Sequence, residues 1–258
     1  LAEFADQMDR AARLSMACAL RELGLFSDPV AAYSTEGLLT QSGATPANRR
    51  VVRRWLRALA ADGLVTRTPE GDWTKLTPVT GQDVQDAWDS VEQAHQGLDD
   101  GAELITFLRS CAQRLADLVR GEDSALSLLF PHGDIGTAEA AYKDNIISRY
   151  VNQAVTAVMR TLADQHTGTL RVLEVGAGVG GTTADVVTAL AGTRIDYLFT
   201  DLSRFFLTDA QRQFSNIPGM RYGLFDINAD LAGQDVEPGG YDAVSYTHLR
   251  AHETLRYL

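Results

Sequence analysis

The fold of this chain is decided by the stretch Leu170-Arg-Val-Leu-Glu-Val-Gly-Ala-Gly-Val-Gly-Gly-Thr-Thr183. An apolar, β-rich run ends in an acid, breaks into alternating glycines, and opens a helical pattern. Glycine is needed where a backbone turns tightly and approaches a ligand closely, and the start of the following helix offers unpaired N–H groups to that ligand. The stretch therefore predicts a strand, a nucleotide-cofactor turn and a helix.

Three acids narrow the choice of cofactor. The next predicted strand, 195–201, ends in Asp201, whose carboxylate suits the two hydroxyls of a ribose. The strand after it, 220–225, is followed by Asp226, placed where an adenine amino group could be bound. Glu174 precedes the glycines, where a carboxylate favours a cationic amino group and offers nothing to a pyrophosphate. Glu174 and Asp226, together with the hydroxyls of Thr182 and Thr183 at the start of the helix, favour S-adenosylmethionine.

A dinucleotide remains an alternative at this point. Gly176, Gly178 and Gly181 formally match the G-x-G-x-x-G pattern of nicotinamide cofactors, so an NAD(P)-dependent oxidoreductase could use the same loop. A glycine-rich turn that binds nothing is a further possibility. Thr182 and Thr183 open the helix with hydroxyls that can bond a carboxylate or the backbone.

The order of these motifs resembles a known family. Glu174-Val-Gly-Ala-Gly-Val-Gly180, Asp201 and Asp226 resemble the successive cofactor motifs of class I S-adenosylmethionine-dependent methyltransferases. Segments 114–122, 128–134 and 141–144 resemble the region before the glycine turn in methyltransferase domains of modular polyketide and nonribosomal peptide synthetases. This resemblance covers roughly residues 1 to 244 and implies a truncated, Rossmann-like α/β methyltransferase sheet.

The resemblance also implies a role for each site residue. Glu174 would meet the methionine amino group, Asp201 the ribose hydroxyls and Asp226 the adenine amine. The positions expected to border the cofactor in other ways are Gly176, Gly178 and Gly180 for close backbone approach, Leu202 and Ile227 flanking the base, and Tyr142 in a helix that covers the pocket. The implied reaction transfers the methyl group of S-adenosylmethionine to a substrate tethered to a carrier protein, with carbon as the first choice of acceptor atom and nitrogen or oxygen as alternatives. The implied partners are that tethered substrate and neighbouring synthase domains.

Four regions are expected. Residues 1–80 combine three helices with a hairpin, which predicts a winged-helix-like domain, and 81–166 are expected to form a helical connector or lid. Residues 167–244 form a partial S-adenosylmethionine-binding domain. Residues 245–258 depart from the family and resemble a translated sequencing adapter, so we interpret them as a non-native tail on a fragment. We assign no catalytic residue, because in the family the fourth strand delivers an Asn or His beyond this point.

The third helix of the N-terminal region presents two different faces. One face carries apolar residues, and the other carries five arginines: Arg49, Arg50, Arg53, Arg54 and Arg57. A winged-helix regulator of DNA is therefore an alternative function, because such a helix can enter the major groove. Residues 1–80 carry about as many acidic as basic side chains, which argues against phosphate binding. A solvated or interdomain face and a partner interface are the other interpretations.

Composition excludes several classes of protein. The net charge of -11 disfavours nucleic acid and anionic membrane as partners, and no apolar run is long enough to span a bilayer. Cys18 and Cys111 lack metal or redox spacing, which indicates free thiols in a cytoplasmic protein. His248 and His252 have helical i, i+4 spacing but no third ligand, so we predict no metal site.

An apolar stripe over 149–162 is expected to pack against the sheet: Tyr150, Val151, Ala154, Val155, Val158, Met159 and Leu162.

Overall fold

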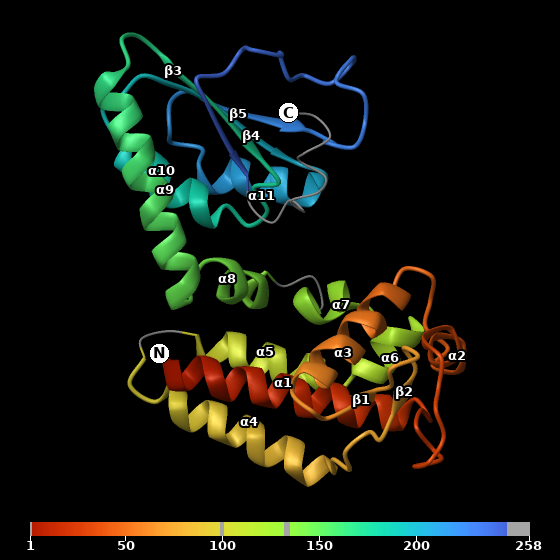
Figure 1. Ribbon diagram of the computed structural model, residues 1–258. Helices are drawn as coiled ribbons and strands as arrows, with labels where there is room; N and C mark the ends of the chain where they lie inside the picture. The colour runs from red at the N-terminus through yellow and green to blue at the C-terminus, as the bar shows by residue number, and fades with distance from the viewer. Residues whose placement is uncertain (1, 99–100, 132–134, 247–258) are drawn as a thin grey trace. The chain divides into compact units, whose positions relative to one another are not determined.

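The computed structural model describes residues 2–98, 101–131 and 135–246. The chain forms two compact units, 1–137 and 138–258, which are described in turn (Figure 1). His132, His248 and His252 lie outside the described residues.

The first unit is mainly helical. Its helices are α1 (Ala2–Glu22), α2 (Thr35–Gln41), α3 (Arg49–Ala61), α4 (Gly81–His95), α5 (Ala102–Ala112), α6 (Leu115–Arg120) and α7 (Ala125–Leu129). Two short antiparallel strands, β1 (Thr66–Arg67) and β2 (Trp73–Thr74), form the predicted hairpin. Tyr33 adds a single antiparallel bridge to Trp73. The three helices predicted within residues 1–80 correspond to α1, α2 and α3.

Helices α1 and α4 pack against each other within this unit. Their shared core contains Ala11, Trp88 and Val91, all buried. The indole N–H of Trp88 donates to Ser15 Oγ at 3.1 Å, and that hydroxyl donates to the carbonyl of Ala11 at 2.7 Å. Because a buried N–H without a partner destabilises a fold, this chain of bonds lets a large aromatic side chain pack between the two helices. Helices α4 to α7, from the segment expected as a connector, thus belong to the first unit.

The second unit contains a parallel four-stranded sheet in the order β5-β4-β3-β6. Its elements are α8 (Gly136–Tyr142), which begins at the boundary between the units, α9 (Ile146–Gln165), β3 (Leu170–Val175), α10 (Gly181–Ala189), β4 (Ile195–Asp201), α11 (Arg204–Gln213), β5 (Met220–Leu224) and β6 (Ala243–Tyr246). Strand, helix and strand alternate from β3 to β5, which is the pattern of a parallel α/β sheet. The strand predicted over 195–201 is confirmed by β4, and the strand predicted over 220–225 corresponds to β5, which ends one residue earlier at Leu224.

The two faces of the sheet are covered differently. Helices α9, α10 and α11 contribute to one core with buried Leu170, Val172, Tyr197 and Phe199 from the central strands. On the opposite face Leu173 and Leu198 pack with Phe225 and Val236, which come from the segment between β5 and β6. Successive side chains of a strand point to opposite faces, so the buried runs in β3 and β4 fill both cores.

The apolar stripe of α9 packs less completely than predicted. Met159 is buried and Val155 partly buried in the core under the sheet, but Tyr150 is 74% and Val158 60% exposed. The stripe spans a wider arc of the helix than the sheet contact covers. The buried face is set instead by Met159 and Asn152, seven residues apart, and Asn152 accepts a hydrogen bond from Thr182 Oγ1 at 2.7 Å.

Three further predictions concern the ends and surface of the chain. Residues 245 and 246, the first two of the predicted tail, continue β6 and pair with Glu174 and Val175, and the rest of the tail lies outside the described residues. Both cysteines are free. Among the described residues, no helix has the length and apolar character required to traverse a bilayer.

Candidate cofactor site

The glycine turn joins β3 to α10 and uses the conformational freedom of its glycines. Gly176, Gly178 and Gly180 have φ angles of 67°, 56° and 72°, a left-handed region that side chains with a Cβ rarely adopt. A Cβ added at Gly178 would meet nothing within 4 Å, so the backbone is open to a ligand there. All three positions therefore have a backbone conformation that favours glycine.

Gly180 and Gly181 lie where neighbouring atoms leave little room for a side chain. A Cβ at Gly180 would lie 3.0 Å from the ring of Phe214, and one at Gly181 would lie 3.1 Å from the carbonyl oxygen of Tyr142. The end of α8 therefore rests directly on the first residue of α10. The Tyr142 side chain itself is 41% exposed. The structure thus places this predicted lid residue beside the glycine turn.

Asp201 reaches the same turn from the neighbouring strand. β3 and β4 are paired in parallel, with Val175 opposite Thr200, so their carboxyl ends lie side by side. The Asp201 carboxylate accepts a hydrogen bond from Gly178 N–H at 3.0 Å through Oδ2 and from Ser203 N–H at 2.8 Å through Oδ1. The side chain is 9% exposed. It therefore points toward the turn and holds it against the end of β4.

Glu174 lies deeper than the other acids. It is 1% exposed, and its Oε2 accepts hydrogen bonds from Thr183 Oγ1 at 2.5 Å and from Tyr197 OH at 2.7 Å. Burial raises the pKa of the Glu174 carboxyl to about 7, and these two bonds oppose the rise. Burial also raises the pKa of the Tyr197 hydroxyl. These contacts tie β3, β4 and α10 together beneath the glycine turn.

Tyr197 is the member of this cluster that the sequence interpretation missed. It lies in β4 beside buried Leu198 and Phe199 and is fully buried. A buried tyrosine hydroxyl almost always needs a partner, so its presence in a core strand could have pointed to the acid on the adjacent strand. Thr183 was expected to bond a carboxylate or the backbone, and its partner is the carboxylate of Glu174.

Asp226 follows β5, next to the end of β4. Phe225 N–H donates to the carbonyl of Asp201 at 3.2 Å, which brings the two strand ends together. The side chain of Gln234 accepts from Asp226 N–H at 2.7 Å and donates to its carbonyl at 3.0 Å. Asp226 Oδ1 accepts from Asn228 N–H at 2.9 Å. Gln234, which the sequence interpretation also missed, fixes the backbone that carries Asp226.

Each of the two apolar residues predicted to flank the base directly follows one of these acids in the chain. Leu202 directly follows Asp201 and is 66% exposed. Ile227 is partly buried against the core that contains Val175 and Phe225. All the predicted cofactor residues of the strands and the turn therefore lie at or near the carboxyl edge of the sheet, the edge where open α/β sheets bind ligands.

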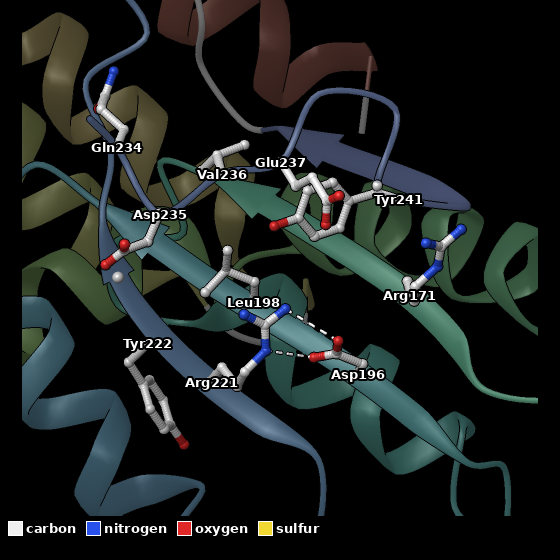
Figure 2. Close-up of a pocket in the computed structure, with 12 residues that line it drawn as sticks. Arg171, Asp196, Leu198, Arg221, Tyr222, Gln234, Asp235, Val236, Glu237 and Tyr241 are labelled. Atoms are coloured by element: carbon white, nitrogen blue, oxygen red, sulfur yellow. Dashed lines mark hydrogen bonds and ion pairs between the residues drawn. The ribbon is translucent and has the colours of Figure 1, made fainter. Parts of the chain in front are cut away.

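A separate cavity of about 760 Å³ lies on the face of the sheet that carries Leu198 and Val236. Figure 2 shows its lining, which includes the two-pronged ion pair of Arg221 with Asp196 and the side chain of Arg171. Those charged residues come from the first halves of the strands, away from the glycine turn. None of the predicted cofactor residues lines this cavity.

Comparisons with known proteins agree with the geometry. The chain is 34% identical over 242 residues to pyochelin synthetase PchF of Pseudomonas aeruginosa (strain UCBPP-PA14), a match that covers 91% of this chain and 13% of that protein. It is 32% identical over 215 residues to polyketide synthase ThaQ of Burkholderia thailandensis, covering 79% of this chain and 10% of that protein. The chain therefore spans a small part of the length of both relatives. No family model matches it.

A solved structure extends the similarity to the fold. The crystal structure of the CurJ carbon methyltransferase superposes with a TM-score of 0.87 at 26% sequence identity, covering 98% of this chain and 68% of that one.

Proposed function

Because this chain belongs to the carbon methyltransferase domains of polyketide and nonribosomal peptide synthases, we propose that it binds S-adenosylmethionine at the carboxyl edge of its sheet. One observation carries the proposal more than any other. The Asp201 carboxylate lies against Gly178 N–H at 3.0 Å, at a point where the turn is open to a ligand. A buried acid beside an open glycine backbone matches a nucleoside, which offers a diol to the acid and close contact to the backbone.

Each of the other residues has a proposed part in holding this cofactor. Asp226 accepts a hydrogen bond from the adenine amine, and Leu202 and Ile227 enclose the faces of the base. Gly176 and Gly180 let the backbone approach the methionine portion. The ionised Glu174 carboxylate attracts the methionine ammonium. Because burial disfavours this ionised form, ionisation of Glu174 and binding of the cofactor are coupled. Tyr142, on the helix that rests on Gly181, covers the pocket.

The bound cofactor supplies an activated methyl group attached to a sulfonium. The residues of this chain orient that group and exclude water, since methyl transfer depends on in-line positioning of an attacking atom. We propose a carbon nucleophile on a carrier-tethered intermediate as the acceptor. We assign no general base among the described residues.

The next proposal concerns the regions into which the chain is divided. We propose that residues 1–80 are a winged-helix-like domain, with three helices followed by a hairpin that Tyr33 extends by one bridge. Residues 81–166 then form the helical lid and connector, and 167–244 the cofactor-binding part. Neighbouring synthase domains would be its partners in the complete protein.

The test is calorimetric titration of the full chain with S-adenosylhomocysteine. Asp201→Asn should weaken binding by about 1 to 3 kcal/mol, the scale of a lost charged hydrogen bond. Asp185→Asn, at an exposed acid on α10, is the matched control and should leave affinity unchanged. Equal affinity of the Asp201 variant and the wild type would remove the ribose role. Binding of NADH in place of S-adenosylhomocysteine would overturn the function itself.

A further inference from the structure

Three arginines form an exposed row along α3. Arg50, Arg54 and Arg57 are spaced by four and three residues, so they lie on one face of the helix over a length of about 10 Å. The opposite face packs into the core of the first unit through Val52, Trp55, Leu56 and Leu59. This arginine row is a set of cations that the cofactor site does not use.

The remaining two arginines of α3 form ion pairs within the first unit. Arg49 and Arg53 bind the two carboxylate oxygens of Glu36 on α2 at 2.8 Å and 2.6 Å. These bonds lower the pKa of the Glu36 carboxyl, with the bond from Arg53 as the largest cause. Among the residues that the structure describes, the arginine row has no such ion pair or side-chain hydrogen bond. It is therefore available to a group outside the unit.

The arginine row also opposes the stability of its own helix. α3 has no acidic residue in its first turn, where the partial positive charge of the helix start favours acids and disfavours arginine. Arg50 and Arg54 are also like charges four residues apart, a spacing that destabilises an isolated helix. Neither an ion pair nor the helix dipole therefore offsets the repulsion within this concentration of positive charge.

We propose that the arginine row binds an acidic helical face of another protein domain. Three guanidinium groups at helical spacing match carboxylates placed at the same spacing on a facing helix, and each can make paired hydrogen bonds. A protein helix fits better than nucleic acid, because residues 1–80 balance ten basic with nine acidic side chains and so lack the excess of positive charge that a duplex requires. The inference does not depend on the proposed cofactor or reaction.

The test measures binding of a designed helical peptide with three glutamates on one face, spaced by four and three residues. A fluorescent label reports its anisotropy against the full chain at about 25 mM salt, where exposed charges are least screened. Arg50→Glu, Arg54→Glu and Arg57→Glu together should weaken binding at least about fivefold, the scale of three exposed ion pairs. A control variant reverses Arg10, Arg160 and Arg194, which are exposed and scattered, and should change affinity less than about twofold.

Two further measurements keep the result decisive. Circular dichroism should show that the reversed variant folds, with a urea midpoint close to that of the wild type, because all three side chains are exposed on α3. If it does not fold, the three arginines are changed to glutamine, and a smaller loss of binding is expected. An equal loss in the control variant, or no binding of the peptide to the wild type, overturns the proposal. So does tighter binding of a 20-base-pair DNA duplex that is lost with the same three arginines.

Discussion

The buried acid beneath the glycine turn makes the second unit sensitive to pH. The pKa of the Glu174 carboxyl is about 7 in the folded chain, against an ordinary value of 4.5. At a pH between about 4.5 and about 7, Glu174 keeps its proton in the folded protein and has released it in the unfolded chain. The stabilisation is therefore complete below about pH 4.5 and is lost as the pH rises through about 7.

The magnitude follows from the difference between the two pKa values. Each unit of pKa corresponds to about 1.4 kcal/mol, so the fold should lose about 3 kcal/mol of stability from this group between pH 4.5 and pH 8. Glu174→Gln removes the titration but leaves an amide oxygen that can accept from Thr183 and Tyr197. Between pH 4.5 and pH 8, the free energy of unfolding of the variant should therefore rise by about 3 kcal/mol relative to that of the wild type.

The assay must report on the second unit. All three tryptophans, Trp55, Trp73 and Trp88, lie in the first unit, so their fluorescence is unsuitable. Native-state hydrogen exchange of the amides in β3 and β4 measures the opening free energy of the sheet directly. We expect the two proteins to differ in the slope of this free energy between pH 5 and pH 8.

Asp185→Asn serves as the control, since it removes an exposed acid from the neighbouring helix, and it should follow the wild-type slope. Parallel slopes for wild type and Glu174→Gln would refute the reasoning, because they would mean that the proton on Glu174 is bound equally in the folded and unfolded chains.

Two further substitutions probe the same region. Tyr197→Phe should destabilise the second unit by about 1 to 3 kcal/mol, and by more at pH 8 than at pH 5, because the ionised carboxylate loses the stronger bond. Urea unfolding at both pH values measures this, and an equal cost at both would contradict it. Gly180→Ala should cost about 1 to 2 kcal/mol through its φ of 72°, with an added clash against Phe214. Its thermal midpoint should fall, and an unchanged midpoint would show that the turn relaxes freely.

Much of the site was predictable because it depends on local backbone requirements. The glycines at 176, 178 and 180 were expected from the spacing alone, and all three have positive φ angles. Asp201 was expected at the end of the adjacent strand, and its carboxylate lies against the turn. Both predictions rest on rules that act within a few residues or between neighbouring parallel strands.

Other features were not predictable because they depend on which surfaces meet. The apolar stripe of α9 is periodic in sequence, but only packing decides that Met159 is buried while Tyr150 is exposed. Likewise, α3 carries five arginines at 49, 50, 53, 54 and 57, and only the position of Glu36 on another helix separates the two paired ones from the exposed row.

The sequence by itself determined the strand, turn and helix order, the residues that must be glycine, and the acids at the strand ends, because these follow from backbone sterics and side-chain chemistry. The tertiary structure alone decided that Glu174 is buried under Thr183 and Tyr197. The physical reason is that burial and hydrogen bonding are properties of groups distant in the chain, brought together only when the sheet and its helices pack.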